Sequence, residues 1–125
     1  MTGADGPAAG DLGIGPGMRI WVGGHNLDAK RAVAPFLVGV ARPVEGPLDV
    51  AVVCPSAPDE AAYFCSKVRS RLAAGSRLYV LVPLLSDGSS DPRFLGGLEG
   101  IESLSGCSCR DDVIPGFGLI DVRRH

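Results

Sequence analysis

The sequence predicts a small α/β domain: a Rossmann-like, open and mostly parallel sheet of about four strands flanked by helices. Two observations support this fold class. Short runs of aliphatic and β-branched residues alternate along the chain with segments whose apolar residues recur at helical spacing. The runs at 48–54 and 77–83 are almost continuously apolar, which is typical of strands buried on both faces. This order implies parallel pairing through right-handed crossovers.

The first strand and helix are predicted near the start of the domain. Residues 19–22 are β-branched and aromatic and precede two glycines, as at the end of a strand. Asn26 or Asp28 is expected to cap the helix that follows, and Pro35 to end or kink it. Residues 36–40 fit either a continued helix or an extra edge strand.

The second strand is the clearest in the sequence, at residues 48–54. Ser56 and Asp59 then have the spacing of a capping box, with a proline in the first turn. The predicted amphipathic helix continues from there to Gly75.

Two further strands complete the predicted sheet. Residues 77–83 form the third strand and lead into a polar loop at 84–91. A helix rich in glycine is expected from Asp91 to Ile101. Residues 116–122 are predicted to form the last strand.

Domain organisation follows from the distribution of glycine and proline. Residues 1–17 contain six glycines and two prolines, so we expect a flexible head, with a single domain at 18–125. Met18 is an alternative native start.

Composition and charge limit the function classes. Of the 125 residues, 46% are hydrophobic and 21% charged, which is typical of a globular protein. The net charge of -2 lacks the signature of a nucleic-acid binder. No apolar run approaches the roughly 20 residues of a membrane span, and the first residues lack the pattern of a secretory signal. We therefore expect a cytoplasmic location and no membrane partner.

The candidate site lies where parallel strands end, because ligands bind beyond the carboxyl ends of strands in open α/β sheets. The loops at 23–26, 55–60 and 84–91 should meet at that edge. Two glycines before a helix allow backbone amides to approach an anion, although a tight turn explains the same glycines. The candidate ligand-binding residues are Gly23, Gly24, Asn26, Ser56, Ser86 and Asp87.

His25 and Glu60 are the candidate catalytic residues. Histidine titrates near neutral pH, which suits acid–base chemistry or phosphate contact; the alternative is an exposed capping histidine. Capping explains Asp59, whereas Glu60 is free to hold a ribose hydroxyl or act as a nucleophile.

The cysteines do not indicate a metal site. Cys54 and Cys65 lie in apolar segments and are expected to be buried free thiols. Cys107 and Cys109 have the wrong spacing for a zinc or redox pair. We therefore expect no metal. The sequence contains no Gly-x-Ser-x-Gly motif, so a hydrolase triad has no anchor.

About half of the chain resembles the nucleoside deoxyribosyltransferases and related nucleotide-sensing Rossmannoids. The resemblance covers residues 19–24 and 49–82, with a glutamate on the helix after a buried strand, and it includes no specific motif. It implies that Glu60 is the nucleophile. The Gly and Ser positions typical of that helix start are Pro58 and Asp59 here, which puts this role in doubt.

The sequence therefore predicts a nucleotide- or phosphometabolite-binding domain, enzymatic or regulatory, with no cofactor identified. One alternative is a non-catalytic interaction module that uses the α/β domain as a scaffold for a protein partner. Another is a nucleoside N-glycosidase or deoxyribosyltransferase-like enzyme.

Overall fold

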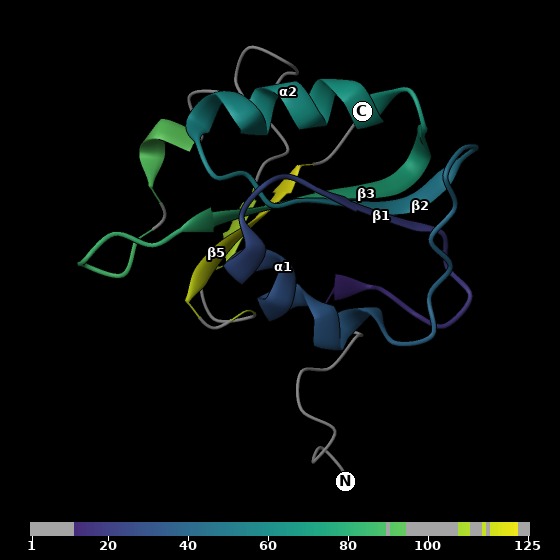
Figure 1. The fold of residues 1–125 in the computed structure, drawn as a ribbon, viewed down its shortest axis with the longest axis horizontal. Coiled ribbons are helices and arrows are strands. Elements are labelled where there is room, and N and C mark those ends of the chain that lie inside the picture. The colour runs from purple at the N-terminus through teal and green to yellow at the C-terminus, as the bar shows by residue number, and fades with distance from the viewer. Residues whose placement is uncertain (1–11, 90, 95–107, 111–113, 115, 123–125) are drawn as a thin grey trace, which may run out of the picture.

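A computed structural model describes residues 12–89, 91–94, 108–110, 114 and 116–122. These residues form an open five-stranded sheet with helices on both faces (Figure 1). The predicted α/β class with an open sheet is confirmed. The strands lie side by side in the order β1-β2-β3-β5-β4, and their bounds are β1 Ile20–Gly23, β2 Leu48–Val53, β3 Leu72–Pro83, β4 Ser108–Arg110 and β5 Phe117–Val122.

The sheet has a parallel half and an antiparallel half. β2 pairs in parallel with β1 and β3, as predicted. β5 runs antiparallel to β3 and β4, so the expectation of parallel pairing is wrong for the last strand. Only residues 111–116 separate β4 from β5, too few for a parallel crossover, which needs about a dozen. β4 was not predicted, because three residues are too few to show a strand pattern.

The helices cover opposite faces of the sheet, as Figure 1 shows. α1 (Leu27–Val33) and the 3-10 helix η3 (Ala34–Leu37) pack on one face, and α2 (Pro58–Arg69) packs on the other. β1, β2 and β3 nevertheless follow one another across the sheet in a single direction. After α1 and η3 the chain first bridges in parallel at Ala41 to Arg19, on the outer side of β1, and only then crosses to β2.

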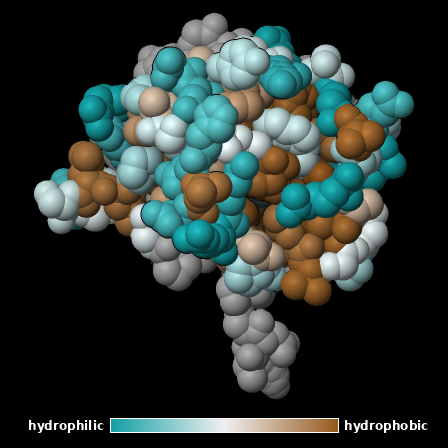
Figure 2. All heavy atoms as spheres, viewed as in Figure 1, coloured by the Kyte–Doolittle hydropathy of each residue, from teal (hydrophilic) through white to brown (hydrophobic). Residues whose placement is uncertain are grey.

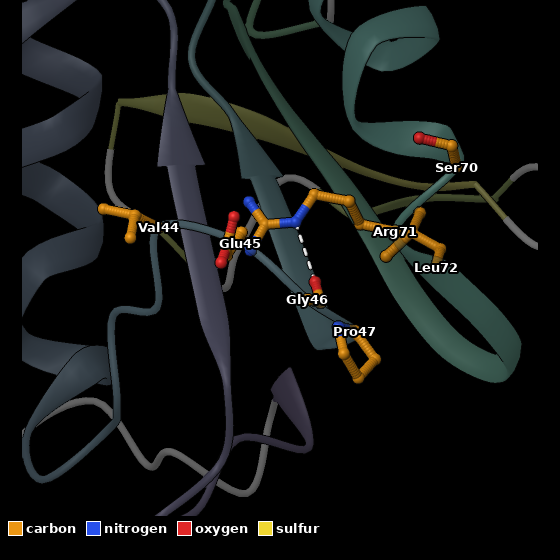
Figure 3. A pocket seen from close by; sticks show the side chains of 7 residues that line it. All are labelled: Val44, Glu45, Gly46, Pro47, Ser70, Arg71 and Leu72. Carbon is orange, nitrogen blue, oxygen red and sulfur yellow. Dashed lines mark hydrogen bonds between the residues drawn. The ribbon is translucent and has the colours of Figure 1, made fainter.

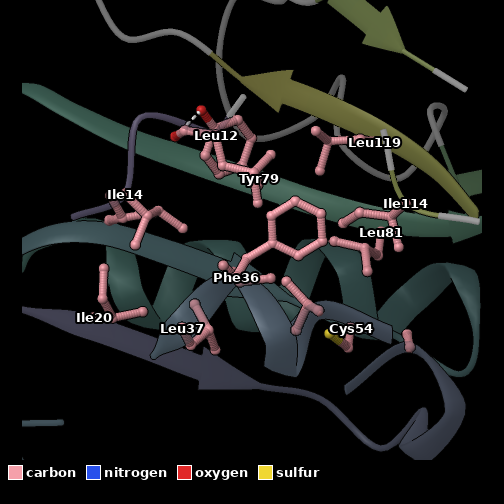
Figure 4. Close-up of a cluster of buried hydrophobic side chains, with 14 residues drawn as sticks. Leu12, Ile14, Ile20, Phe36, Leu37, Cys54, Tyr79, Leu81, Ile114 and Leu119 are labelled. Carbon is pink, nitrogen blue, oxygen red and sulfur yellow. Dashed lines mark hydrogen bonds between the residues drawn. The ribbon is translucent and has the colours of Figure 1, made fainter. Parts of the chain in front are cut away.

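The continuously apolar strands are explained by burial on both faces. Val50 and Val52 of β2 pack on the α1 side, whereas Ala51 and Val53 pack on the α2 side. The α1-side core is centred on Phe36, together with side chains of β2, β3 and β5 (Figure 4).

Residues 12–17, the described part of the predicted head, pack on the domain. Leu12 and Ile14 are fully or almost fully buried in the α1-side core. The Tyr79 hydroxyl donates a 2.6 Å hydrogen bond to the Leu12 carbonyl, drawn in Figure 4. The expected boundary at residue 17 therefore does not hold for Leu12 and Ile14, which belong to the core; residues 1–11 lie outside the described residues.

The first predicted helix is confirmed. The Asn26 side chain accepts a 3.1 Å hydrogen bond from the Ala29 amide and caps α1. Pro35 lies in η3, which follows α1 directly. Beyond it, Ala41 makes an isolated parallel bridge to Arg19 at the outer edge of β1.

The second predicted helix differs at both ends. Its N-cap is Ala57 rather than Ser56, and no side chain caps it, so the predicted capping box is wrong. The helix ends at Arg69 instead of continuing to Gly75, because Leu72 pairs with Leu48 in the sheet. Gly75 lies within β3 with φ +91°, where the β2–β3 register shifts.

Cys54 and Cys65 are buried free thiols, as predicted. Burial raises the pKa of each to about 12. Cys107 lies outside the described residues, as does most of the helix expected at 91–101, of which residues 92–94 are helical.

Over the described part of the chain, no helix has the length and apolar character needed to cross a membrane. Figure 2 shows apolar residues in several separate places on one face of the molecule. Within the described ranges, the exposed large apolar side chains are Leu27, Val38, Val44, Tyr63 and Leu85.

Candidate functional site

Glu60 joins the loop after β1 to the loop after β2. Its Oε1 accepts hydrogen bonds from the backbone amides of Ser56, at 3.1 Å, and His25, at 3.3 Å. Its Oε2 accepts the Ser56 hydroxyl at 2.6 Å and lies 3.1 Å from His25 Nδ1. The carboxylate therefore has two partners on each oxygen, which is about its full acceptor capacity.

These partners stabilise the ionised form of Glu60. Hydrogen bonds from Ser56, and then from His25, lower the pKa of the Glu60 carboxyl from 4.5 to about 2. Glu60 is in the first turn of α2, and its side chain reaches back to the residue before the Ala57 cap. It therefore orders the residues that precede α2 without capping the helix itself.

His25 is oriented by Glu60 and faces solvent. Because the carboxylate only accepts, Nδ1 must carry the proton of the hydrogen bond in a neutral ring, leaving Nε2 as an acceptor. The His25 side chain is 73% exposed, against 21% for Glu60. The structure therefore brings together the two predicted catalytic residues and Ser56, with the imidazole as the outward-facing group.

An aromatic cluster, which we define as Trp21, Tyr63 and Phe64, adjoins His25. The His25 ring meets the Phe64 ring edge to face, with centroids 5.6 Å apart. Phe64 also contacts Tyr63 at 5.0 Å and Trp21 at 6.1 Å. Tyr63 is 60% exposed, so part of the cluster is open to a partner or ligand.

The sequence did not single out Trp21 or Phe64 as site residues. Trp21 lies in the predicted first strand, and Phe64 lies in the predicted amphipathic helix. The four-residue spacing from Glu60 to Phe64, which places both on one side of α2, was the available signal.

Packing explains Gly23 and Gly24. A Cβ at Gly24 would lie 2.1 Å from the Cys54 carbonyl oxygen, and Gly24 has φ +113°. A Cβ at Gly23 would lie 2.1 Å from the Trp21 ring. The two glycines therefore permit a tight turn against β2 and Trp21, which is the alternative to an anion cradle.

The remaining predicted residues divide between two places. The Asn26 side chain caps α1, and the Asn26 backbone N–H donates to the Cys54 carbonyl at 3.0 Å. Asn26 therefore fixes the loop at 23–26 that carries His25. Ser86 and Asp87 are exposed in the loop after β3. There Asp87 accepts hydrogen bonds from the Ser89 amide and hydroxyl, which lower the pKa of its carboxyl. No described hydrogen bond connects this loop to His25 or Glu60.

The charge near His25 disfavours a free phosphate. Asp28 is in the first turn of α1, and Asp59 and Glu60 are in the first turn of α2. These carboxylates offset the positive helix ends that would otherwise attract an anion. The site is better suited to a neutral or hydroxyl-bearing group.

Among the described residues, no three His, Cys, Asp or Glu side chains are grouped as metal ligands would be.

Comparisons with known proteins show a likeness of fold only. No family model matches the chain, and no curated protein matches it significantly. A similar solved structure is Aeropyrum pernix fibrillarin in complex with natively bound S-adenosyl-L-methionine, with a TM-score of 0.48 and 15% identity over 93% of this chain. Another is the B. subtilis M1A22 tRNA methyltransferase TrmK, with a TM-score of 0.39 and 15% identity over 82% of this chain. The chain spans 63% and 49% of the length of these two proteins.

Proposed function

We propose that this domain binds a nucleoside-like small molecule at the carboxyl edge of β1 and β2, with His25 as the main contact residue. The observation that carries the proposal is the Glu60 carboxylate, which holds the imidazole in one orientation with Nε2 outward. A residue oriented in this way offers a directional hydrogen bond at a sheet edge where open α/β folds bind ligands.

The aromatic cluster and the local charge favour a nucleoside over a phosphometabolite. Phe64 and the exposed Tyr63 provide apolar ring surface beside His25. Asp59 and the ionised Glu60, both in the first turn of α2, disfavour a phosphate at the same place, whereas Asp28 is paired with Arg31 at 3.6 Å. For a nucleotide, we therefore expect contact through its base and ribose, with the phosphate directed toward solvent.

Glu60 is proposed to act as a positioning residue. A carboxylate nucleophile needs a lone pair directed at the substrate, and all four acceptor positions of Glu60 have donors. A general acid would need a raised pKa, whereas the pKa of Glu60 is lowered. These observations count against the N-glycosidase alternative and leave His25 as the group available for acid–base chemistry.

The proposal is tested by titrating nucleosides against the His25 imidazole. The chain has two histidines, so His125→Gln leaves a single imidazole for proton NMR. We expect at least one of adenosine, guanosine, cytidine and uridine to shift the His25 resonances saturably. At 100 times its dissociation constant such a ligand should add about 2.7 kcal/mol to the free energy of unfolding.

Matched variants separate binding at His25 from binding elsewhere. His25→Ala should abolish the stabilisation, whereas Ser86→Ala, in the loop after β3, should retain it. If no nucleoside or nucleotide shifts the imidazole, or if His25→Ala keeps the full stabilisation, the proposal is wrong.

Exposed apolar residues support a second candidate, a protein-interaction surface on the same side. Leu27 is 62% exposed and lies two residues after His25 in the chain. Tyr63 is 60% exposed, and its ring contacts Phe64, which in turn contacts the His25 ring. A protein partner that binds wild type and is lost in Leu27→Ser and Tyr63→Ser, without any nucleoside response, would favour this reading.

A further inference from the structure

A cavity of about 510 Å³ lies at the opposite end of the sheet from His25. It is formed where β2 and β3 begin and where α2 ends, as Figure 3 shows. This volume is in the range of small-molecule sites. The lining residues are Val44, Glu45, Gly46, Pro47, Ser70, Arg71 and Leu72.

Arg71 extends its guanidinium across this cavity to the loop at 43–47 (Figure 3). Its Nε donates to the Gly46 carbonyl at 2.8 Å, and one terminal nitrogen donates to the Pro43 carbonyl at 3.3 Å. A guanidinium has five N–H donors, so three are without a partner among the described residues. Arg71 therefore combines a fixed position with spare donors.

Arg19 holds the same loop from the other side. It donates to the Pro47 carbonyl at 2.7 Å and to the Glu45 carbonyl at 3.1 Å. Neither Arg19 nor Arg71 has a carboxylate within 4.0 Å of its guanidinium among the described residues. Their guanidinium partners are neutral carbonyls, and the Asp49 carboxylate accepts a 2.8 Å hydrogen bond from the Arg19 backbone amide rather than from its guanidinium.

A second hollow extends the basic region. It has a volume of about 250 Å³, it is lined by the exposed Arg42, and it shares Val44 with the larger cavity. Arg19 and Arg71 thus donate to one loop, and Arg42 directly precedes it, in a chain whose net charge is -2. Glu45 and Asp49 are the described carboxylates in or next to that loop and reduce this charge without cancelling it.

We propose that the 510 Å³ cavity binds the phosphate group of a small phosphorylated metabolite, with Arg71 as its main contact. The planar guanidinium presents paired N–H donors that match phosphate oxygens, and the Ser70 hydroxyl lines the same cavity. This site is separate from the His25 edge, and its ligand differs in charge from the one proposed there.

Ribose 5-phosphate is the probe, and ribose is its uncharged control. Calorimetric titration of the wild-type chain at low ionic strength should give saturable binding of ribose 5-phosphate and none of ribose. Added salt should weaken the binding, because the attraction is between charges. Arg71→Gln should abolish it, with circular dichroism confirming that the variant is folded.

Val44 provides a variant that leaves the arginine contacts in place. Its side chain is 95% exposed, so Val44→Glu adds a negative charge to the cavity rim without disturbing the core. We expect Val44→Glu to weaken binding by about threefold to tenfold. Val44→Gln, without the charge, and Leu85→Glu, at the other end of the sheet, should stay within about twofold of wild type.

The proposal is overturned by no saturable binding of ribose 5-phosphate to wild type, by equal binding of ribose, or by equal affinities for Val44→Glu and Val44→Gln. A loss of affinity in Leu85→Glu as large as the loss in Val44→Glu would also overturn the proposal, because the effect would then reflect the net charge of the protein alone.

Discussion

At the scale of single residues, Glu60 shows how one side chain organises two loops. Ser56 and His25 come from different strand ends, and both hydrogen-bond to the Glu60 carboxylate. Four donors around an ionised group contribute more than neutral hydrogen bonds, because each is strengthened by the charge. The orientation of His25 therefore depends on Glu60 remaining ionised.

Glu60→Gln should lower the free energy of unfolding by about 1 to 3 kcal/mol at pH 7. The pKa of Glu60 is about 2 in the folded state against an ordinary 4.5. Its contribution is therefore complete above about pH 4.5 and is lost as the pH falls toward 2. The difference between the variant and wild type should shrink over that interval, as measured by urea unfolding at several pH values.

The control for this prediction is Asp59→Asn, one residue earlier in the same turn. Asp59 is exposed and has no hydrogen bond among the described residues, so we expect a change within about 0.5 kcal/mol. An effect of Glu60→Gln that is equal at pH 7 and pH 3 would show that the carboxylate is not held in its charged form.

At the scale of elements, the packing of residues 12–17 changes where the domain begins. Leu12 and Ile14 are buried against strands and η3 although the surrounding sequence is rich in glycine and proline. The Tyr79 hydroxyl donates a hydrogen bond to the buried Leu12 carbonyl and so satisfies this polar group. This segment therefore closes the α1-side core.

Leu12→Ala should lower the free energy of unfolding by about 2 to 5 kcal/mol, because it removes a fully buried side chain and leaves a cavity. The matched control is Leu27→Ala, the same substitution at a side chain that is 62% exposed, which should change stability by about 0.5 kcal/mol or less. Equal effects of the two substitutions in urea unfolding would show that Leu12 does not belong to the core.

At the scale of the whole molecule, the sheet separates two apolar cores. Cys54 lies in the core beneath α1, and Cys65 lies in the core beneath α2. The strands β2 and β3 contribute side chains to both cores, so neither core can open without disturbing the same strands. We expect the two cores to unfold together.

Thiol accessibility measures this directly. In a Cys107→Ser, Cys109→Ser background, adding Cys65→Ala leaves Cys54 alone, and adding Cys54→Ala leaves Cys65 alone. Neither thiol should react with Ellman's reagent at pH 8 in the native state, since burial raises the pKa of each to about 12.

With increasing urea, each remaining thiol should become reactive at the same midpoint as loss of circular dichroism in that variant. A thiol that reacts well below that midpoint would show that one core opens independently of the other.

The sequence by itself determined most of the secondary structure of residues 19–83. Periodicity located β2, and the glycine pair located the end of β1, because burial on both faces and tight turns leave direct marks on residue type. The same residues predicted that His25, Ser56 and Glu60 would meet, since parallel strands end at one edge. Of the two expected caps of α1, Asn26 and Asp28, the structure shows Asn26.

Only the tertiary structure decided features that depend on contacts distant in the chain. Leu12 is buried because its side chain packs in the α1-side core and its carbonyl bonds to Tyr79. No pattern in the neighbouring sequence predicts these contacts. Leu72 leaves the helical pattern because it pairs with Leu48. Glu60 is a fully bonded anchor rather than a free carboxylate because His25 approaches from 35 residues away. Local sequence specifies propensity and burial, whereas the partner of a polar group is set by which segments the fold brings together.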